Sequence, residues 1–348
     1  MINVNDNNYL DVVRFLVKDN RMKQRGTNLQ NIPSKGNGEK VRRCFVPSKG
    51  WVFVGADLSQ IEPRIQSHIM YTRYGDNSLR SIFVEGVDLY TTMAMRTFNL
   101  DEKYCVDKAY DPTNSFQPRK LMKQGVLAVS YQQTPKAFAK TMNVSEQVAE
   151  DFFKNFEESF PSFSTMVKDT IDFMRKNGFT ETLYGRKRRF PKYQYYQRQI
   201  RQNEPKLREL YQKRKKLLSI ERPTPLQQEQ FKKIQEQIRE LRKPQALAAK
   251  NEREAFNAVI QGTGSDILKQ NGARMYKVCL EKGWRMNASI HDELIISMPE
   301  KDVTPENIQL VNDIMTKTVK LSVPLKSDTV IMTEWMEEVS PEEWFSRG

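Results

Sequence analysis

The chain has 348 residues, 38% of them hydrophobic, so it can bury a substantial core and is long enough for two lobes. Its 56 Lys and Arg residues outnumber its 43 Asp and Glu residues, and the net charge of +13 favours a polyanionic partner, although solvated surface charge would give the same total. No run approaches the roughly 18 apolar residues of a membrane span, and three cysteines without metal-ligand spacing argue against a disulfide framework.

The first 50 residues are polar and interrupted by Gly and Pro. They lack the basic start and apolar stretch of a signal peptide, so we expect a cytoplasmic protein, from a bacterium or a phage-infected cell. A short helix is predicted near 9–20 and a loop over 28–38. Residues 51–56 then form an apolar strand.

Helical spacing begins at Ser59 and continues to about residue 178, with breaks at 111–114 and 160–162. This stretch predicts a helical lobe inserted into a sheet domain. The segment 178–190 alternates apolar and polar residues around Tyr184-Gly185, which indicates a β-hairpin.

Residues 192–250 carry 16 Lys and Arg against 6 Asp and Glu, so most of the positive surplus lies in this segment. Apolar residues recur there at spacings of three and four on both sides of a turn at 221–225, which predicts an antiparallel helical hairpin. Such a hairpin could lie along nucleic acid, or it could simply be a solvated pair of helices.

The last third of the chain returns to mixed structure. A helix after residue 251 carries N-A-V-I-Q-G-T-G-S-D, and apolar strands at 286–290 and 294–298 flank His291-Asp292-Glu293. This pattern predicts a β-hairpin with acids at its tip. An amphipathic helix over 306–319 and a strand near 328–333 follow.

Two acidic clusters lie far apart in the sequence: Asp57, in V-G-A-D-L-S-Q-I-E-P-R, and the pair Asp292-Glu293. Each adjoins a predicted buried strand, where an ionised carboxylate is costly to desolvate. Together they could hold a pair of divalent cations that handle phosphates. The alternative is that they are carboxylates of surface turns.

A helix with the sequence R-K-L-M-K-Q-G-V-L-A-V-S-Y repeats chemistry every four residues, at Arg119, Lys123, Leu127 and Tyr131. These positions drift across about 120° of one face and span roughly 18 Å. The two cations could grip a triphosphate while Leu127 and Tyr131 meet a base and sugar. A stripe of core residues and solvated charges would have the same spacing.

The chain resembles the polymerase region of family A DNA polymerases, the DNA polymerase I type, over nearly all of residues 20–348. The resemblance rests on five motifs in order, N-L-Q-N-I-P, D-L-S-Q-I-E-P-R, R-x-x-x-K with a later Tyr, N-A-V-I-Q-G-T-G-S-D and H-D-E. It implies an α+β right-hand fold with an antiparallel palm sheet and a large helical fingers lobe. The implied ranges are palm 1–70, fingers 71–256 with the basic insertion at about 192–250, and palm 257–348.

The resemblance also implies a catalytic site for two Mg²⁺ ions. Asp57 and Asp292 match the metal-binding aspartates, and the Leu58 carbonyl is a further ligand. Glu293 matches a supporting acid beside the second aspartate. In this family one ion lowers the pKa of the primer 3′-hydroxyl and the other stabilises the leaving pyrophosphate.

The remaining matches concern nucleotide and DNA. Arg119 and Lys123 match residues that hold the incoming triphosphate, and Lys123 is also placed to protonate pyrophosphate. Glu62 matches the residue that crowds the sugar 2′ position. The nucleotide set is completed by Gln60, Tyr90, Leu127 and Tyr131. The set that contacts the primer terminus or the duplex minor groove is Arg21, Arg253, Asn257, Gln261 and His291. Surface polarity would also account for Asn257 and Gln261, and a capped turn for His291.

Three positions depart from the family pattern. Leu127 stands where Phe or Tyr is usual, so discrimination at the sugar 3′ position does not carry over. Gln132 replaces a Gly, which tolerates backbone angles that Gln does not. Tyr90 replaces a phosphate-contacting His, and it can donate one hydrogen bond but carries no charge.

The function implied is template-directed DNA synthesis from dNTPs on a primer–template. Because the motifs start so near residue 1, we expect the C-terminal part of a split or truncated polymerase, without a thumb. In a split enzyme a second polypeptide would supply the thumb and an exonuclease. A single-subunit RNA polymerase shares these motifs, although Glu62 and the Gln-Gly-Thr helix favour DNA. A non-catalytic DNA-binding fragment of a polymerase assembly is the alternative outside the enzymes.

Overall fold

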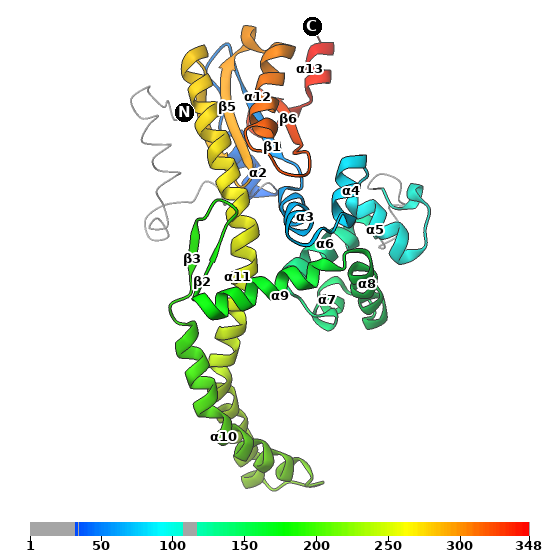
Figure 1. Ribbon diagram of the computed structural model, residues 1–348, viewed down its shortest axis with the longest axis vertical. Coiled ribbons are helices and arrows are strands. Elements are labelled where there is room, and N and C mark those ends of the chain that lie inside the picture. Colours follow the sequence, from blue (N-terminus) through cyan, green and yellow to red (C-terminus); the bar gives the residue numbers. More distant parts are fainter. Residues whose placement is uncertain (1–31, 34, 107–116, 348) are drawn as a thin grey trace. The chain divides into compact units, whose positions relative to one another are not determined.

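The computed structural model describes residues 32–33, 35–106 and 117–347. The predicted helix at 9–20 and the predicted break at 111–114 lie outside these residues. The described chain forms two compact units (Figure 1). Unit 1 combines the chain up to Val87 with the chain from Thr263 onward, and unit 2 is the continuous segment Asp88–Gly262.

Unit 1 is built on a five-stranded sheet with the order β4-β5-β1-β6-β7, in which every neighbouring pair is antiparallel. The strands are β1 (Trp51–Leu58), β4 (Arg285–Ile290), β5 (Glu293–Pro299), β6 (Ser327–Met332) and β7 (Glu338–Val339). β1 is central because its apolar run W-V-F-V-G-A-D-L is buried almost throughout. A strand from the start of the chain therefore lies between two strands from its end.

Helices of unit 1 flank this sheet. They are α2 (Asn37–Arg43), α3 (Ile61–Tyr74), α4 (Ser78–Glu85), α12 (Pro305–Lys317) and α13 (Pro341–Ser346). α12 contacts β1 and β6, and its start is fixed by Thr304, whose hydroxyl accepts a hydrogen bond from the Asn307 amide. The short 3₁₀ turn Glu300–Asp302 precedes α12.

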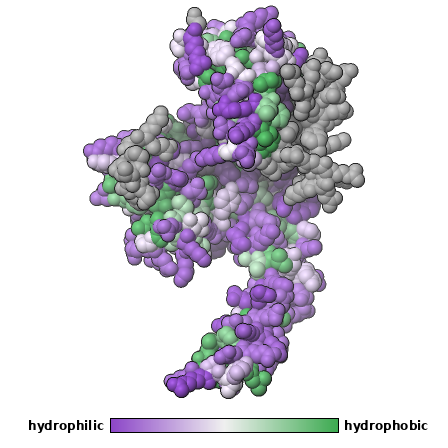
Figure 2. Space-filling model, turned by 180° about the vertical axis from the view of Figure 1, so that it is seen from behind, coloured by the Kyte–Doolittle hydropathy of each residue, from purple (hydrophilic) through white to green (hydrophobic). Residues whose placement is uncertain are grey.

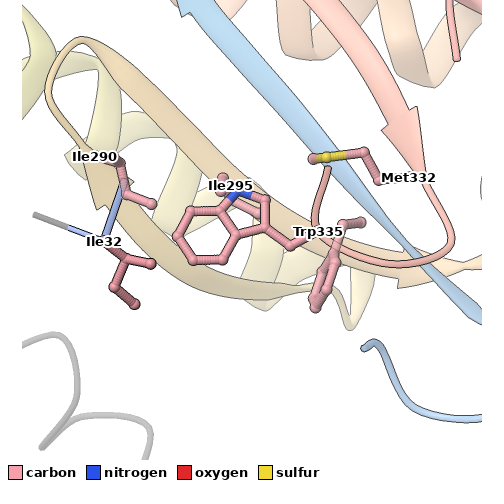
Figure 3. Packing of buried hydrophobic residues seen from close by; sticks show 6 residues of the cluster. Ile32, Ile290, Ile295, Met332 and Trp335 are labelled. Carbon is pink, nitrogen blue, oxygen red and sulfur yellow. The ribbon is translucent and has the colours of Figure 1, made fainter. Parts of the chain in front are cut away.

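An apolar cluster of unit 1 joins the β4–β5 hairpin to β1 (Figure 3). Its buried members are Ile32, Phe53, Ile290, Ile295, Met332 and Trp335. The Trp335 ring stands edge-on to Phe45 with centroids 5.5 Å apart, and the Arg42 guanidinium lies 4.5 Å from the Trp335 ring centre. This packing fixes the end of β4 near the end of β1, where the predicted acids lie.

Unit 2 has a helical core. Its helices before the hairpin are α5 (Leu89–Phe98), α6 (Pro118–Ser130), α7 (Pro135–Met142), α8 (Glu146–Ser159) and α9 (Ser162–Asn177), with a 3₁₀ turn at Glu102–Tyr104. Phenylalanines connect these helices: Phe156 stacks against Phe160 and Phe163 with both centroid distances 5.0 Å. α6 and α8 approach closely at Gly125, where an added Cβ would lie 2.6 Å from the Phe152 ring.

A β-hairpin and two long helices complete unit 2. The hairpin strands are β2 (Phe179–Glu181) and β3 (Lys187–Arg189), the first long helix is α10 (Tyr193–Leu218) and the second is α11 (Pro225–Lys282), which also contributes residues to unit 1. We call residues 193–250 the helical arm. Its buried seam consists of Leu207, Leu210 and Ile238, with Ile234 and Leu241 packed beside them.

Most elements predicted from the sequence are confirmed. They are the strand from Trp51, the break at 160–162, both β-hairpins, the helix near 306–319 and the strand near 328–333. The helix predicted after residue 251 is also confirmed, and it is continuous with the second helix of the arm, because α11 runs unbroken from Pro225 to Lys282. The sequence also missed α2, β7 and α13, which are short and have little periodicity. Within the described residues, no helix is both long and apolar enough to cross a membrane.

Candidate active site

The end of β1 in unit 1 brings the predicted acids together. In the sheet register Asp57 pairs with Glu293 on β5 and with Asp328 on β6. The amide of Leu58 donates to the backbone carbonyl of Asp292 across 3.2 Å, so the β4–β5 turn is tied to the same strand end. Residues separated by most of the chain therefore form one acidic cluster.

The β4–β5 turn consists of two residues, His291 and Asp292. His291 has φ 55°, a left-handed conformation that hairpin turns usually assign to Gly or Asn. A histidine held in this region stores strain, and such strain concentrates at functional sites. The exposed His291 side chain stays a predicted DNA contact.

The acidic cluster has unusual electrostatics. Burial raises the pKa of Asp57 to about 6, assisted by the charges of Asp292 and Asp328 and by a hydrogen bond with the Asp292 carboxyl group. Burial likewise raises the pKa of Glu293 to about 7, with the charge of Asp57 as the next cause. The crowded carboxylates at this strand end repel one another, so a bound cation would relieve their repulsion.

The Glu293 carboxylate lies against Gly55 of β1, where there is no room for a side chain. A Cβ built on Gly55 of β1 would lie 2.5 Å from Glu293 Oε1, so any larger residue at 55 would displace the carboxylate. Arg42 acts against the raised pKa of Glu293, but burial and the neighbouring acids outweigh it. The sequence placed Glu293 beside the site and gave no signal for the role of Gly55.

The donor chemistry of this cluster fits a hard divalent cation. Carboxylates and backbone carbonyls are the ligands that Mg²⁺ accepts, and Asp57, Asp292 and Leu58 offer these groups at one strand end. Among residues 32–33, 35–106 and 117–347, however, no group of three or more His, Cys, Asp and Glu side chains is arranged to hold a metal ion. The ions and their number therefore stay a prediction.

Sequence reasoning missed Asp328. Its side chain accepts a hydrogen bond from the Ser59 hydroxyl, and Lys326 Nζ lies 3.8 Å from its carboxylate. The amide of Ser59 also donates to the Lys326 carbonyl at 2.9 Å. Only the register between β1 and β6 places Asp328 beside Asp57, and register cannot be inferred from the β6 pattern alone.

The turn from β1 into α3 holds Gln60 and Glu62. Gln60 has φ 53° and ψ 41°, again left-handed, and Glu62 lies in the first turn of α3. Arg64 fixes this turn, because its guanidinium donates to the Ser59 carbonyl at 2.9 Å and to the Pro324 carbonyl at 2.5 Å. Burial lowers the pKa of the Arg64 guanidinium.

A second group of predicted residues lies in unit 2, on and beside α6. Leu121, Met122 and Val126 are buried, whereas Lys123 is exposed and Arg119, Leu127 and Tyr131 are half-buried. The stripe noted in the sequence is therefore the more accessible side of an amphipathic helix.

Arg119 is held by Asp88. Its Nε donates to Asp88 Oδ1 at 3.1 Å and its Nη2 to Asp88 Oδ2 at 2.9 Å, a two-pronged pair that favours planar geometry. Asp88 also caps α5 by accepting from the Thr91 amide at 2.8 Å. Burial opposes ionisation of Asp88, but these hydrogen bonds outweigh it and lower the pKa of Asp88. The Arg119 guanidinium lies 5.6 Å from the Tyr90 ring centre.

The other end of α6 meets α11. Tyr131 caps α6, and Gln261 Nε2 donates to the Tyr131 hydroxyl at 2.6 Å. Arg253, Asn257 and Gln261 follow one another at four-residue spacing on α11 and share one side of it. The predicted nucleotide contact Tyr131 and the predicted DNA contact Gln261 are therefore in direct contact within unit 2. Arg21 lies outside the described residues.

Comparisons with known proteins decide the family. The profile of DNA polymerase family A matches residues 15–337. This chain belongs to DNA polymerase family A. It is 29% identical to DNA polymerase I of Chloroflexus aurantiacus over 92% of this chain and 28% of that protein, and 26% identical to the thermostable DNA polymerase I of Thermus aquaticus over 91% of this chain and 31% of that protein.

A solved structure extends the family A likeness to three dimensions. The POL domain of Pol1 from M. smegmatis, in complex with DNA primer-template and dNTP, matches with a TM-score of 0.63 and 26% identity, over 88% of this chain and 44% of that chain. The predicted α+β fold, with an antiparallel sheet and a large helical lobe, is confirmed. The chain spans about a third of the length of the two DNA polymerase I relatives.

One departure from the family A pattern has a structural counterpart. Gln132, which directly follows Tyr131, has φ 55°, in the left-handed region that Gly enters without penalty. Its buried Nε2 has no hydrogen-bond partner among the described residues. Among the residues that the structure describes, the other left-handed residues at helix ends are Gly or Asn, with Gln60 as the second exception. Gln132 therefore adopts this conformation at some cost in free energy.

Proposed function

We propose that this chain is a template-directed DNA polymerase that adds dNTPs to a primer 3′-hydroxyl. The observation that carries the proposal is the acidic cluster at the end of β1, where the sheet register sets Asp57 opposite Glu293 and the Leu58 amide holds the Asp292 carbonyl, inside a family A domain. Paired acids of this kind are typical of a site that receives cations together with a phosphate substrate. The complex of the M. smegmatis relative with primer-template and dNTP supports the choice of substrates.

In this proposal the acidic cluster holds two Mg²⁺ ions through Asp57, Asp292 and the Leu58 carbonyl. With divalent ions bound there, the primer 3′-hydroxyl would lose its proton more readily and the leaving pyrophosphate would be stabilised. Glu293 supports the site by setting the field around Asp57, and Asp328 is a further acid beside the same strand end.

Each unit contributes its own set of proposed nucleotide contacts, on α6 in unit 2 and at the start of α3 in unit 1. Arg119 and Lys123 contact the triphosphate, Lys123 protonates the pyrophosphate, and Asp88 positions Arg119 in its two-pronged geometry. Leu127 and Tyr131 meet the base and sugar. In unit 1, at the start of α3, Glu62 is proposed to crowd the sugar 2′ position and Gln60 to contact the nucleotide.

Duplex DNA is contacted by Arg253, Asn257, Gln261 and His291, with Arg21 beyond the described residues. Minor-groove contacts of this type use acceptors that all base pairs share, so they test pair shape and do not read sequence. The residues 1–70 and 257–348 correspond to the palm and 71–256 to the fingers. A second polypeptide that supplies a thumb and an exonuclease stays part of this proposal.

Primer extension tests the proposal. We expect the wild type to extend a primer with dNTPs and Mg²⁺, and Asp292→Asn to lose extension by at least about 1,000-fold while it still binds primer–template. The control is Glu300→Gln, which changes an exposed acid outside the acidic cluster. This variant should extend the primer normally. If the wild type binds DNA but never extends a primer, alone or with candidate partners, the chain would be a non-catalytic DNA-binding fragment.

The same assay separates the two polymerase classes. We expect dNTPs to be incorporated much faster than rNTPs, because Glu62 limits room at the sugar 2′ position. Glu62→Ala should narrow this preference by about 100-fold or more. Preference of the wild type for rNTPs would identify an RNA polymerase.

A further inference from the structure

The helical arm lies outside every motif used above. The packing of its two helices determines on which side each Lys and Arg residue lies. Leu207 and Leu210 of α10 pack against Ile238 of α11, and Asn203 Nδ2 donates to the Leu241 carbonyl at 3.0 Å. These contacts define which side of each helix faces the partner helix. Figure 1 shows α10 beside the first part of α11 along this seam.

Cations follow the seam at fixed positions. Arg201, Arg208 and Arg239 each come directly after a residue packed between the helices, namely Ile200, Leu207 and Ile238. Lys215 and Lys232 continue the seven-residue spacing, and Arg242 follows Leu241. A residue one position after the seam lies about 100° further around its helix.

The cations of α10 and those of α11 lie on the same side of the arm. Two antiparallel helices wind in opposite senses when viewed from one end, so positions that follow the seam on each helix emerge on the same side. We call this side the basic face. It consists of Arg201, Arg208, Lys215, Lys232, Arg239 and Arg242. From residue 201 to residue 215 it extends about 21 Å along α10.

Most cations of the basic face have no acidic partner. Arg208 pairs with Glu204 at 2.5 Å, whereas none of the other five is within ion-pair distance of a carboxylate among the described residues. Arg242 instead donates to Gln245 Oε1 at 3.2 Å.

On the opposite side of the arm, several lysines form ion pairs. There Lys206 and Lys213 directly precede seam positions, and both pair with Glu209 at 2.8 Å and 2.6 Å. Lys233 pairs with Glu229 at 2.7 Å. The cations of the basic face are therefore mostly unpaired, whereas Lys206, Lys213 and Lys233 on the opposite side each have an acidic partner.

We propose that the basic face binds the phosphate backbone of duplex DNA without reading its sequence. Unpaired, flexible cations in two rows complement a regular polyanion. Within residues 201–215 and 228–242 no large hydrophobic side chain is exposed, which disfavours a protein interface or insertion into a membrane surface. In Figure 2 the arm is largely hydrophilic, with apolar residues gathered toward its turn, where Leu218 and Leu226 are exposed.

The inference rests on the proposed function only for the choice of DNA as partner. Binding can be measured in EDTA, without extension, so failure of polymerase activity would not affect it. Conversely, a polymerase that is active but whose basic face is irrelevant to DNA binding would leave the proposed function standing.

A matched pair of triple variants in the full chain tests the basic face. The first is Arg201→Gln with Lys215→Gln and Arg239→Gln, and the control is Lys206→Gln with Lys213→Gln and Lys233→Gln. Both remove three positive charges from exposed positions of the same helices. The readout is fluorescence anisotropy of a labelled duplex over a range of NaCl concentrations.

We expect the first variant to lower the slope of log affinity against log salt by about 2 to 3, because each lost phosphate contact removes about 0.9. The control should change the slope by less than about 1. The double variant Arg201→Lys with Arg239→Lys should keep the wild-type slope. Far-ultraviolet circular dichroism checks that the arm stays helical in each protein.

Three outcomes would overturn the inference. Equal slopes for wild type and the first variant would show that the basic face does not meet phosphates. Equal losses in both variants would show a response to total charge alone. Binding to vesicles of phosphatidylserine that depends on the basic face, without any effect on DNA, would assign the face to anionic lipid.

Discussion

At the scale of single residues, the site is held together by groups that oppose one another. Asp57 and Glu293 repel one another and burial makes the ionisation of both costly, yet the sheet register forces them together. The fold therefore carries electrostatic strain that depends on pH and on bound cations.

Glu293 gives a pH prediction. Its pKa is raised from 4.5 to about 7 in the folded chain, so its contribution to stability is complete below about pH 4.5 and is lost as the pH rises through 7. In EDTA, Glu293→Gln should therefore be more stable than wild type at pH 8 by about 2 kcal/mol and should match it near pH 4.5.

Urea unfolding at the two pH values measures this difference. Glu300→Gln, which changes an exposed acid, serves as the control and should behave as wild type. A Glu293→Gln variant that is less stable than wild type at pH 8 would mean that the carboxylate makes a favourable contact there.

Asp88 gives a prediction about Arg119. Asp88→Asn keeps an N-cap for α5 but cannot accept both prongs of the guanidinium. We expect kcat/KM for dNTPs to fall by about tenfold, mainly through KM, because Arg119 loses its fixed orientation. Steady-state extension kinetics provide the measurement. Tighter dNTP binding would indicate that Asp88 competes with the triphosphate for Arg119.

Gln132 gives a prediction about stability. Replacing it with Gly removes a left-handed Gln and a buried, unpaired amide. We expect Gln132→Gly to stabilise the chain by about 1 kcal/mol in urea unfolding. Asn143, which is also left-handed at a helix end, supplies the comparison: Asn143→Gly should change stability by less, since Asn tolerates this region. A loss of stability in Gln132→Gly would show that the Gln side chain packs favourably.

At the scale of elements, the sequence predicted those strands and turns that have a local pattern of apolar and turn-forming residues. The apolar run of β1 and the acids at the β4–β5 turn were visible because burial and turn chemistry are local signals. The register that sets Asp328 beside Asp57 was not visible, since it depends on a strand found far along the chain. The Asp88–Arg119 pair was missed for the same reason: neither residue's pattern indicates its partner.

Glycines show how the helices of unit 2 depend on close approach. In Gly125→Ala the new methyl group would lie 2.6 to 3.0 Å from three ring atoms of Phe152, which is buried and cannot move aside. We expect a loss of about 1 to 3 kcal/mol in urea unfolding despite the better helix propensity of Ala. Unchanged stability would mean that α6 and α8 separate at little cost.

Gly272→Ala is the matched control on α11. Its Cβ would meet only the mobile end of Met286 at 3.3 Å and a Leu294 methyl at 3.9 Å. Because those atoms can give way, the helix propensity of Ala should dominate, and stability should stay equal or rise by up to about 1 kcal/mol.

At the scale of the whole molecule, the two units differ in how the chain builds them. Unit 2 is one continuous segment, Asp88–Gly262, with its own phenylalanine core. We therefore expect the excised segment 88–262 to unfold cooperatively on heating, monitored by circular dichroism. Separate 1–87 and 263–348 fragments should show no such transition, because β1 needs β5 and β6. Cooperative unfolding of either fragment alone would contradict this account.

The central position of β1 also bears on synthesis. Its apolar segment leaves the ribosome well before its sheet neighbours β5 and β6 exist, since some 235 residues separate Asp57 from Asp292. At typical translation speeds this interval is roughly 10 to 50 s. During that time the nascent strand is an exposed edge, so chaperone occupancy at residues 51–58 should be highest before the final hairpin emerges.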